Sequence, residues 1–445
     1  MKDDYDTLII GGGPGGLAAA YTLQPSQKLM VIEGNLWGGT CPNFGCDPKK
    51  MLYGVVENRR QAQNYGGKGI AAAPKVNWPD MMAFKHSYTD KVPTGTEVGL
   101  EGSGIEHRHG QAEFVDAHTV RVGDEQISAQ NIIIATGAHP AKPDVAGADL
   151  LETSTNFLNL PDLPAEIGFI GGGYVAIELA NIAVLAGSRV HIIQHNERIL
   201  RGFPEEYSTI VAKQLAAKGV QFHWNTSVNS VTKDDAGGVT ALTDAGTELH
   251  FDHLYAATGR PANIDGLNLA AAGIASERGG ITVDENLRTT AANVYAVGDV
   301  VARKIPKLTP VAGLEGRYVA RVIQGDKDPI VYPPIPHVVF AGPELAEVGV
   351  DLSTAERQSG KYEVTTQDVG SWYTYQRLAD KDARVTTITD RKSGQLVGAV
   401  VLAADAEELI NYLTALITAK APATALSKWV PAYPSVASDL GYFYN

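Results

Sequence analysis

The chain has 445 residues, of which 37 are basic and 50 are acidic, so its formal net charge is −13 at pH 7. A chain of this length exceeds one compact core, and two to four domains are expected. The acidic balance argues against nucleic acid or an anionic membrane as a partner, because both are bound by basic surfaces.

No stretch of the sequence approaches the ~20 apolar residues of a membrane span. The N-terminus does not resemble a signal peptide either, since three aspartates lie among its first six residues and glycines interrupt the first apolar run. We therefore expect a cytoplasmic enzyme.

A glycine-rich turn follows the first predicted strand. Residues 5–10 form that buried strand, residues 11–16 are Gly-Gly-Gly-Pro-Gly-Gly, and a helix-like run comes next. Glycines at the first, third and sixth positions let backbone N–H groups approach a pyrophosphate at a helix N-terminus. A second strand at residues 28–32 ends at Glu33, where a carboxylate suits the hydroxyls of a ribose. These features predict a bound dinucleotide; the alternative is a tight turn beside a surface glutamate.

Both cysteines of the chain lie in residues 38–50, Gly-Gly-Thr-Cys-Pro-Asn-Phe-Gly-Cys-Asp-Pro-Lys-Lys. Cys41 and Cys46 open what looks like a helix, whose N-terminus stabilises a thiolate. A zinc site would need more Cys or clustered His ligands, and the chain has no further Cys. A purely structural bridge is uncommon in intracellular proteins. The segment therefore predicts a redox-active pair and no metal site.

The order of strand, turn and helix recurs in the middle of the chain. Residues 165–170 form a predicted strand, residues 171–176 repeat the fingerprint spacing with alanine in last place, and residues 189–193 form the next strand. Each fingerprint is followed later by an apolar strand that ends in a turn, at residues 132–137 and 254–260. We therefore predict two nucleotide-binding units.

The last third of the chain has a different composition. Residues 293–299 form a predicted strand ending on Asp299, and Thr309-Pro310 starts a helix, because proline loses no hydrogen bond there. After residue 331 the sequence predicts an α+β module without a fingerprint, which is expected to pair subunits. Its predicted elements are strands at 337–340, 383–390 and 395–401 and two helix-like stretches around 404–418.

The cysteine segment, the two fingerprints, Tyr295-Ala296-Val297-Gly298-Asp299 and the terminal module resemble the flavoprotein disulfide reductases of the glutathione reductase and dihydrolipoamide dehydrogenase group. The resemblance covers nearly the whole chain. It implies an α/β fold with two Rossmann-like domains, for FAD and NAD(P), and a C-terminal α+β dimerisation domain. The implied segments are 1–148 (FAD-binding, first part), 149–264 (NAD(P)-binding), 265–330 (FAD-binding, second and central part) and 331–445 (dimerisation).

The resemblance also implies which residues bind the cofactors. The implied FAD-binding residues are Gly11, Gly13, Pro14, Gly15, Gly16, Glu33, Thr40, Lys49, Gly110, Ala112, Asp299 and Thr309. The implied NAD(P)H-binding residues are Gly171, Gly173, Tyr174, Val175, Ala176, Glu178, His195, Arg201, Gly259 and Arg260.

A catalytic set follows from the same resemblance: Cys41, Cys46, Lys49, Glu178 and Tyr433. Cys46 matches the thiol that faces the flavin, and Cys41 matches the interchange thiol that attacks the substrate. Lys49 and Glu178 match an ion pair at the point where hydride arrives, and the alternative is an ordinary solvated pair.

The charge at the end of the second unit's second strand bears on the nicotinamide cofactor. An NAD enzyme usually carries a carboxylate there, which would repel a 2′-phosphate. Here Gln194-His195 is followed by Arg198 and Arg201. The resemblance aligns His195 and Arg201 with two arginines that hold the 2′-phosphate in NADPH-using members. We expect NADPH rather than NADH; the alternative is that the arginines only solvate a helix start.

The C-terminal segment departs from the pattern of the group. Members carry a His and, five positions later, a Glu, which protonate the leaving thiolate from the other subunit; this chain has Tyr433 and Ser438. A tyrosine with a pKa near ~10 donates a proton but shuttles one poorly at neutral pH. Tyr21 replaces an arginine that binds a glutathione carboxylate. We expect a cis bond between Tyr433 and Pro434, and an aromatic tail, residues 441–445, that lines the substrate pocket or the dimer interface.

We therefore predict an FAD-dependent homodimer that oxidises NAD(P)H and passes electrons through Cys41 and Cys46 to a small acceptor, preferably a low-molecular-weight disulfide. A metal ion or a quinone is the alternative acceptor. The alternative from another class is a flavin-bearing redox sensor without turnover. The intact Lys49, Glu178 and Tyr174 speak against the sensor, whereas the altered C-terminal segment speaks for it.

Overall fold

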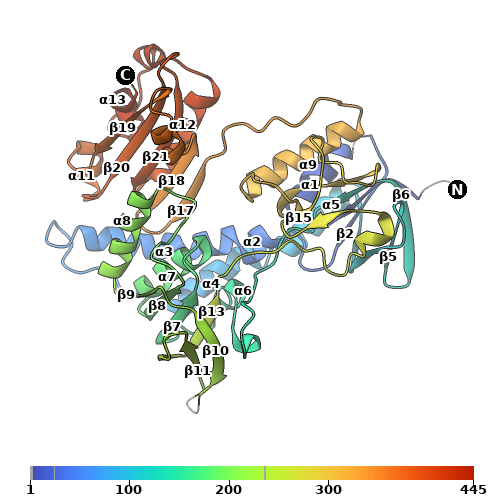
Figure 1. Cartoon of the computed structure of the whole chain (residues 1–445), viewed down its shortest axis with the longest axis horizontal. Coiled ribbons are helices and arrows are strands. Elements are labelled where there is room, and N and C mark those ends of the chain that lie inside the picture. The colour runs from blue at the N-terminus through green and yellow to red at the C-terminus, as the bar shows by residue number, and fades with distance from the viewer. Residues whose placement is uncertain (1–3, 25, 235–236, 445) are drawn as a thin grey trace. The chain divides into compact units, whose positions relative to one another are not determined.

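The structure is a computed structural model that describes residues 4–24, 26–234 and 237–444. It divides into two compact units, whose elements Figure 1 labels in chain order. Unit 1 comprises Met1–Met51, Ala83–Ala141 and Gly259–Val331, and unit 2 comprises Leu52–Met82, Lys142–Thr258 and Tyr332–Asn445. The four segments predicted from the sequence remain a prediction.

A seven-stranded sheet forms the centre of unit 1. Its order is β3-β2-β1-β6-β5-β4, and β16 also pairs with β6. Strands β3, β2, β1, β6 and β16 pair in parallel, whereas β6 also pairs antiparallel with β5, and β5 pairs antiparallel with β4. The strands are β1 (Tyr5–Ile10), β2 (Leu29–Glu33), β3 (Glu106–His109), β4 (Ala112–Phe114), β5 (Thr119–Val122), β6 (Glu125–Ile134) and β16 (Val294–Ala296).

Both faces of this sheet are buried. Successive side chains of a strand point to opposite faces, so Leu8 and Ile10 belong to one apolar cluster and Ile9 to another. Helices α1 (Pro14–Leu23) and α9 (Thr309–Ile323) pack side by side (Figure 1). Residue 316 must be glycine there, because a Cβ would lie 2.1 Å from the carbonyl oxygen of Gly15.

Unit 1 also contains further helices and a small strand pair, and helices α3 and α4 each include residues of both units. The helices are α2 (Thr40–Phe44), α3 (Cys46–Asn64), α4 (Trp78–Thr89), α5 (Val92–Gly102) and the 3-10 turns η2 (Leu269–Ala272) and η3 (Gly298–Val300). Strands β14 (Ser276–Glu277) and β15 (Gly280–Ile281) form a small antiparallel pair.

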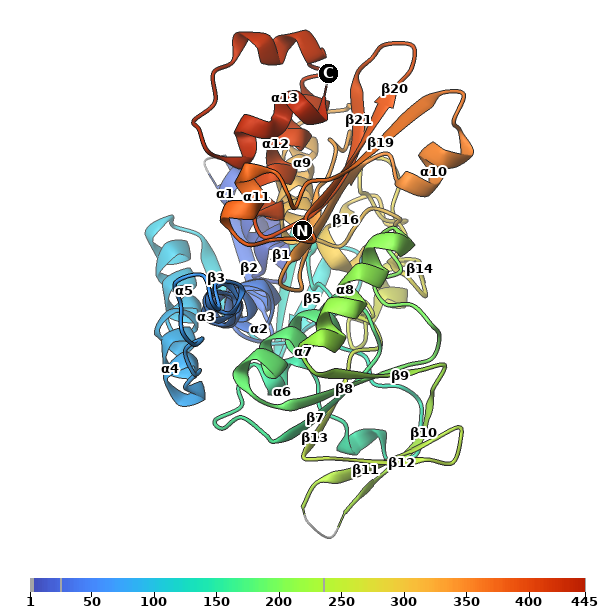
Figure 2. The same cartoon turned by 90° about the vertical axis from the view of Figure 1, so that its left-hand side faces the viewer.

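Unit 2 contains a second parallel sheet, of order β13-β7-β8-β9. Figure 2 shows it below α7 and α8, with the antiparallel strands β10, β11 and β12 next to it. The strands are β7 (Glu166–Ile170), β8 (Arg189–Gln194), β9 (Val220–Trp224), β10 (Val228–Lys233), β11 (Val239–Thr243), β12 (Glu248–Phe251) and β13 (His253–Ala256). The helices are η1 (Ala148–Leu150), α6 (Ser154–Phe157), α7 (Tyr174–Ala186) and α8 (Glu205–Ala217).

The C-terminal module, also in unit 2, is an antiparallel sheet of order β17-β18-β21-β20-β19. Helix α12 packs against it and buries Leu409, Ile410 and Leu413. The strands are β17 (His337–Phe340), β18 (Glu344–Gly349), β19 (Tyr362–Asp368), β20 (Arg384–Asp390) and β21 (Leu396–Ala403). The helices are α10 (Leu352–Arg357), α11 (Tyr373–Arg377), α12 (Ala406–Thr418), η4 (Ala423–Lys428), η5 (Val436–Asp439) and α13 (Leu440–Phe443).

Two parallel sheets with a strand, glycine turn and helix each, followed by an antiparallel module with helices, confirm the predicted fold class. The prediction of two helix-like stretches around residues 404–418 was wrong. One helix, α12, spans Ala406–Thr418. Neither glycine nor proline occurs in that stretch, so nothing in the sequence breaks the helix.

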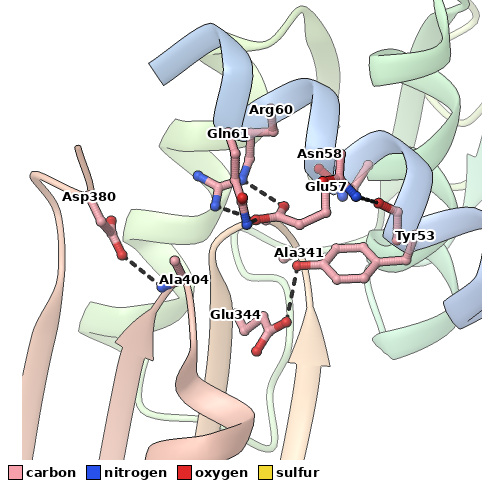
Figure 3. A network of polar contacts seen from close by, with 12 residues as sticks. Tyr53, Glu57, Asn58, Arg60, Gln61, Ala341, Glu344, Asp380 and Ala404 are labelled. Atoms are coloured by element: carbon pink, nitrogen blue, oxygen red, sulfur yellow. Dashed lines mark hydrogen bonds and ion pairs between the residues drawn. The ribbon is translucent and has the colours of Figure 1, made fainter. Parts of the chain in front are cut away.

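Buried polar groups connect α3 to the C-terminal sheet within unit 2 (Figure 3). The Arg60 guanidinium donates to both carboxylate oxygens of Glu57, at 2.7 and 2.5 Å, and the Tyr53 hydroxyl donates to Oε1 of Glu344 at 3.2 Å. Glu344 is 2% exposed, and burial raises its pKa to about 11. Its carboxyl is therefore protonated at neutral pH.

Candidate active site

The two glycine turns contain glycines that are present for two different reasons. Gly11 has φ +114°, and a Cβ there would lie 2.3 Å from the carbonyl oxygen of Ala135, so conformation and packing both require glycine. Gly13 has φ −86°, and the nearest atom to a Cβ would be 3.6 Å away. Gly173 has φ −85°, and a Cβ would meet no atom of the described residues within 4 Å. The close approach of a pyrophosphate explains these last two glycines, so both turns fit a dinucleotide.

Glu33 lies beside the first turn at the end of β2. It is 9% exposed, and its two oxygens accept hydrogen bonds of 2.7 Å from the N–H groups of Gly12 and Asn35. The N–H of Gly110 donates to the Glu33 carbonyl oxygen at 2.9 Å, and Ala112 begins the strand that follows. The structure thus brings Glu33 and Gly110, both predicted to contact the adenosine half of FAD, into hydrogen-bond contact, and Ala112 of the same predicted set follows two residues later.

The cysteine segment packs against the first glycine turn. Gly39 has φ +72°, and a Cβ there would lie 2.6 Å from the Cα of Gly13. Gly39 also caps α2, where the Asn43 side chain donates to the carbonyl oxygens of Trp37 and Gly39 at 2.9 and 2.8 Å. These contacts hold Cys41, in the first turn of α2, close to the turn that fits a pyrophosphate.

The two thiols lie on two helices rather than at the start of one. Helix α2 ends at Gly45, whose φ of −132° and ψ of −115° are not helical, and Cys46 is the first residue of α3. Thr309 begins α9, and its Oγ1 lies 3.9 Å from the Sγ of Cys46. Cys46 therefore has both a helix N-terminus and a hydroxyl beside its sulfur.

Cys46 is the more acidic of the two thiols. The hydrogen bond from Cys41 is the largest cause that lowers the pKa of Cys46 to about 6; burial opposes it, and the charges of Lys49 and Lys50 lower it further. The same hydrogen bond, together with burial, raises the pKa of Cys41. The reduced pair is therefore a thiolate at Cys46 and a thiol at Cys41 at neutral pH.

Arg260 lies near Cys46 in unit 1, and Asp299 lies near Arg260. Burial lowers the pKa of Arg260, although the charges of Asp299 and Cys46 oppose this shift. Burial raises the pKa of Asp299, and the charge of Arg260 opposes that shift. The Arg260 guanidinium donates to the carbonyl oxygen of Ala138 at 2.7 Å. Asp299 lies in the 3-10 turn η3 rather than in the strand β16 itself. Gly259 and Arg260 thus lie among predicted FAD residues, and their contact with NAD(P)H remains a prediction.

Helix α7 presents the predicted nicotinamide-binding residues of unit 2. The turn at Gly171 and Gly173 leads into Tyr174, Val175 and Ala176 in its first turn. The ring centroid of Tyr174 is 5.5 Å from that of Phe203 and 6.4 Å from that of His337.

Glu178 lies one turn further along α7. It is 2% exposed, and its Oε1 accepts a hydrogen bond of 3.0 Å from the N–H of Phe340. A backbone donor thus supports a carboxylate that is otherwise costly to bury. Lys49 belongs to unit 1 and Glu178 to unit 2, so the predicted ion pair between them remains a prediction.

His195 and Arg201 come together after β8. The Arg201 guanidinium lies 3.5 Å from the Nε2 of His195, and both side chains are exposed. Arg198 instead donates to the carbonyl oxygen of Phe203 and pairs with Glu205 at 3.7 Å. Of the two arginines, Arg201 is therefore the one available to an anion.

Tyr433, in unit 2, is 76% exposed, and its ring stacks on that of Tyr373 with centroids 6.2 Å apart. The expected cis bond between Tyr433 and Pro434 is confirmed. The hydroxyl of Ser438 donates to the carbonyl oxygen of Ser435 at 2.6 Å and so stabilises a local turn. The position of the Glu in the group's pattern thus has a structural role in this chain.

The expectation that the aromatic tail lines a pocket or an interface was wrong for two of its residues. Phe443 and Tyr444 are 4% and 2% exposed and belong to the apolar core of their own C-terminal module. Phe443 stacks on Trp372, and the Tyr444 hydroxyl lies within hydrogen-bond distance of the carbonyl oxygens of Gly394 and Ala421, at 3.0 and 2.8 Å. Phe443 ends the short helix α13 and Tyr444 directly follows it, and a helix of four residues is too short for its periodicity to be recognised in the sequence.

One group beside the thiols had not been singled out from the sequence. The Oδ1 of Asp47 lies 3.8 Å from the Sγ of Cys41, and its Oδ2 accepts a hydrogen bond of 2.9 Å from the Tyr88 hydroxyl. Asp47 directly follows Cys46, so its position was a usable signal. Tyr88 lies 41 positions further on and had no local signal.

The described residues form neither a cluster of metal ligands nor a helix suited to crossing a membrane. No three side chains of His, Cys, Asp or Glu among them gather as a metal ion would require. Of the helices formed by these residues, none combines the length and apolar character needed to cross a membrane.

Comparison with known proteins adds to this geometry. The family model described as pyridine nucleotide-disulphide oxidoreductase matches residues 5–316, and that of its dimerisation domain matches residues 335–442. A glutathione reductase of Burkholderia cepacia is 32% identical, with 99% of this chain and 98% of that protein covered. A dihydrolipoyl dehydrogenase of Bacillus subtilis (strain 168) is also 32% identical, with 97% and 94% covered.

Solved structures are similar over the whole chain as well. The HOCl-induced flavoprotein disulfide reductase RclA from Escherichia coli has a TM-score of 0.89 and 27% identity, with 99% of each chain covered. Its Cu(II) complex has a TM-score of 0.89 and 28% identity, with 100% of this chain and 99% of that chain covered.

Proposed function

Because the chain belongs to the pyridine nucleotide-disulphide oxidoreductase family, we propose that it oxidises NAD(P)H and passes the electrons through Cys41 and Cys46 to a low-molecular-weight disulfide. The observation that carries the proposal is the thiol pair itself. A thiolate at the start of α3 that accepts a hydrogen bond from a thiol on α2 is the reduced form that thiol–disulfide exchange requires.

The two cysteines have different roles in this proposal. Cys46, which lies beside Thr309 at the start of α9, would be the thiol next to the flavin, and Cys41 would be the thiol that attacks the substrate. FAD, when bound, supplies the two-electron chemistry between the nicotinamide and the disulfide. The first glycine turn, Glu33 and Asp299 would hold FAD, and Thr40 and Lys49 would lie beside its ring system.

We propose NADPH as the preferred reductant. Arg201 is exposed next to His195, and neither residue repels a 2′-phosphate as a carboxylate would. Arg201→Ala is expected to raise the KM for NADPH by about tenfold or more, since hydrogen bonds to charged groups contribute about 1.5–3 kcal/mol. NADH lacks this phosphate and serves as the internal control, so an equal rise of both KM values would contradict the assignment.

We also propose that the enzyme is a homodimer. The match of residues 335–442 to a dimerisation domain supports this assembly. In the family pattern the C-terminal segment serves the other subunit's thiols, which would bring the exposed Tyr433 to the partner's site.

A metal ion is the second candidate acceptor. One observation favours it, namely the similarity to a structure described as a Cu(II) complex of a flavoprotein disulfide reductase. The part of the chain that the structure describes has no cluster of three potential ligands, so the ion would be a substrate and not a resident cofactor.

Anaerobic titration of the purified flavoprotein with NADPH and NADH tests the proposal, followed by stopped-flow mixing with disulfides, quinones and Cu(II). We expect NADPH to give a two-electron-reduced state and a disulfide to restore the oxidised spectrum within seconds. Reoxidation by Cu(II) or quinones alone would mean that a metal ion or a quinone, and not a disulfide, is the acceptor. Failure of both nucleotides to reduce the protein would contradict the enzyme.

A further inference from the structure

Asp47 lies between the thiol of Cys41 and the phenol of Tyr88 in unit 1. Its Oδ1 is 3.8 Å from the Sγ of Cys41, and its Oδ2 accepts a hydrogen bond of 2.9 Å from the Tyr88 hydroxyl. Asp47 is half-buried in the first turn of α3, Cys41 lies on α2, and Tyr88 lies in the last turn of α4. Three helices therefore fix a carboxylate at the thiol that meets the substrate.

We propose that Asp47 is the acid–base catalyst of thiol–disulfide exchange at Cys41 and that Tyr88 positions it. The inference rests on the proposed function, because it needs a disulfide as acceptor. It assigns proton transfer to a residue of the same subunit as the thiols, and not to Tyr433 of the partner subunit. Tyr433 stands where members of the group carry a His. A tyrosine is poorly suited to accept and return a proton at neutral pH.

The charged and titratable groups around Asp47 support this role. Cys41 faces Asp47 from α2 and Tyr88 faces it from α4, while on α3 itself the charges of Lys49 and Lys50 act on the neighbouring Cys46. The hydrogen bond to Asp47 raises the pKa of Tyr88, so the phenol stays a donor. The hydrogen bond to Cys46, burial and the charge of Asp47 raise the pKa of Cys41. This thiol therefore needs a base before it becomes a nucleophile.

Proton and electron transfer balance over two steps. In the first step the sulfur of Cys41 attacks a disulfide RSSR while its proton passes to Asp47, and the S–S bond breaks. The leaving RS⁻ takes that proton and departs as RSH, which leaves a mixed disulfide at Cys41. In the second step the thiolate of Cys46 attacks the sulfur of Cys41 and releases the second RS⁻, which takes a proton from water. The dithiol has then given two electrons to one disulfide.

Two probes of different leaving-group acidity test the role of Asp47. The full-length holoenzyme is reduced anaerobically with NADPH and mixed with bis(2-hydroxyethyl) disulfide or with 5,5′-dithiobis(2-nitrobenzoate). The first releases an alkyl thiolate, which needs a proton to leave readily. The second releases an aromatic thiolate whose conjugate thiol has so low a pKa that it leaves without a proton. For Asp47→Asn we expect about 100-fold slower reoxidation by the alkyl disulfide, and a loss at least about tenfold smaller with the aromatic one.

Matched variants separate catalysis from structure. Tyr88→Phe keeps the ring, and we expect a smaller loss with the same dependence on the leaving group. Combined with Asp47→Asn it should add nothing, because positioning has no effect without the carboxylate. Asp124→Asn removes an exposed carboxylate between β5 and β6 of the same unit and should react like the wild type. Unchanged FAD content and reduction by NADPH verify the fold of each variant.

Several outcomes would overturn the inference. They are wild-type rates in Asp47→Asn, an equal loss with both probes, or a leaving-group-dependent loss in Tyr433→Phe instead. In each case the wild type still reduces disulfides, so the proposed function stands. If the NADPH-reduced wild type is reoxidised by neither probe, the proposed function fails, and the inference fails with it.

Discussion

The thiol of Cys46 is acidic because of groups that reach it from three elements of unit 1. The hydrogen bond comes from Cys41 on α2, the positive charges of Lys49 and Lys50 lie on α3, and the hydroxyl of Thr309 lies on α9. Each of these lowers the pKa, and together they outweigh burial, which raises it. Ionisation at Cys46 is therefore built from side chains that are close only in the folded chain.

A pair of variants tests the hydrogen bond from Cys41. Cys41→Ser keeps a hydroxyl that can donate to the thiolate, whereas Cys41→Ala has no donor. We expect the long-wavelength absorbance of a thiolate beside oxidised FAD in Cys41→Ser to appear as the pH rises through about 6 and to be lost below it. In Cys41→Ala the midpoint should lie at higher pH. An unchanged midpoint, or absorbance that survives in Cys46→Ser, would contradict the assignment.

The sequence could propose residues of the candidate site where the pattern is local. The two glycine turns, Glu33 and both cysteines lie within short segments whose spacing carries the information. Asp47 lies in the same segment, but its role depends on the position of Cys41 across the break at Gly45. The hydrogen bond from Tyr88 joins two helices, and no periodicity relates their residues.

At the scale of elements, the part of α3 that belongs to unit 2 is joined to the C-terminal sheet by the hydrogen bond from Tyr53 to Glu344 (Figure 3). Glu344 begins β18, and its Oε2 accepts a hydrogen bond of 3.2 Å from the N–H of Glu407 at the start of α12. The Tyr53 hydroxyl donates to its other oxygen. A protonated carboxyl thus connects α3, β18 and α12.

The protonation of Glu344 predicts how stability depends on pH. The native carboxyl keeps its proton up to about pH 11, whereas an ordinary glutamate releases it near 4.5. Above pH 4.5 the unfolded chain therefore binds fewer protons than the native one, and the contribution of Glu344 to stability falls as the pH rises. Glu344→Gln has no such proton to lose. Its stability relative to wild type should increase by about 1.4 kcal/mol per pH unit between pH 5 and 7.

Thermal unfolding of both proteins across this pH range measures the difference. Glu344→Ala is the matched variant that removes the hydrogen bonds as well, and it should be less stable than Glu344→Gln at every pH. Parallel curves for wild type and Glu344→Gln would mean that the carboxyl is ionised in the native state.

Elements were predicted well where apolar runs are continuous and less well in the C-terminal module. The expected strands at β1, β7, β8 and β17 match within one residue at each end. Strands β18 and β19 were not predicted. Glu344 and Glu347 in β18 are ionisable residues that the fold buries, and most residues of β19, at the sheet edge, are exposed or half-buried. Tertiary packing decided these strands, and local propensity did not reveal them.

At the scale of the whole molecule, the assembly is the next property to measure. The match of the C-terminal module to a dimerisation domain leads us to expect a mass of about twice the 47.3 kDa of one chain. Light scattering coupled to size exclusion measures this mass directly. A monomer with full disulfide reductase activity would contradict the homodimer and would remove Tyr433 of a partner subunit from the mechanism, while leaving Asp47 in place.

The route of the electrons is tested most directly in one turnover. Wild type and Cys41→Ser are reduced anaerobically with one equivalent of NADPH and mixed with excess disulfide, and the flavin spectrum is followed in a stopped-flow instrument. We predict that the wild type returns to its oxidised spectrum within seconds and that Cys41→Ser stays reduced. Reoxidation of Cys41→Ser at the wild-type rate would mean that electrons leave without passing through the thiol pair.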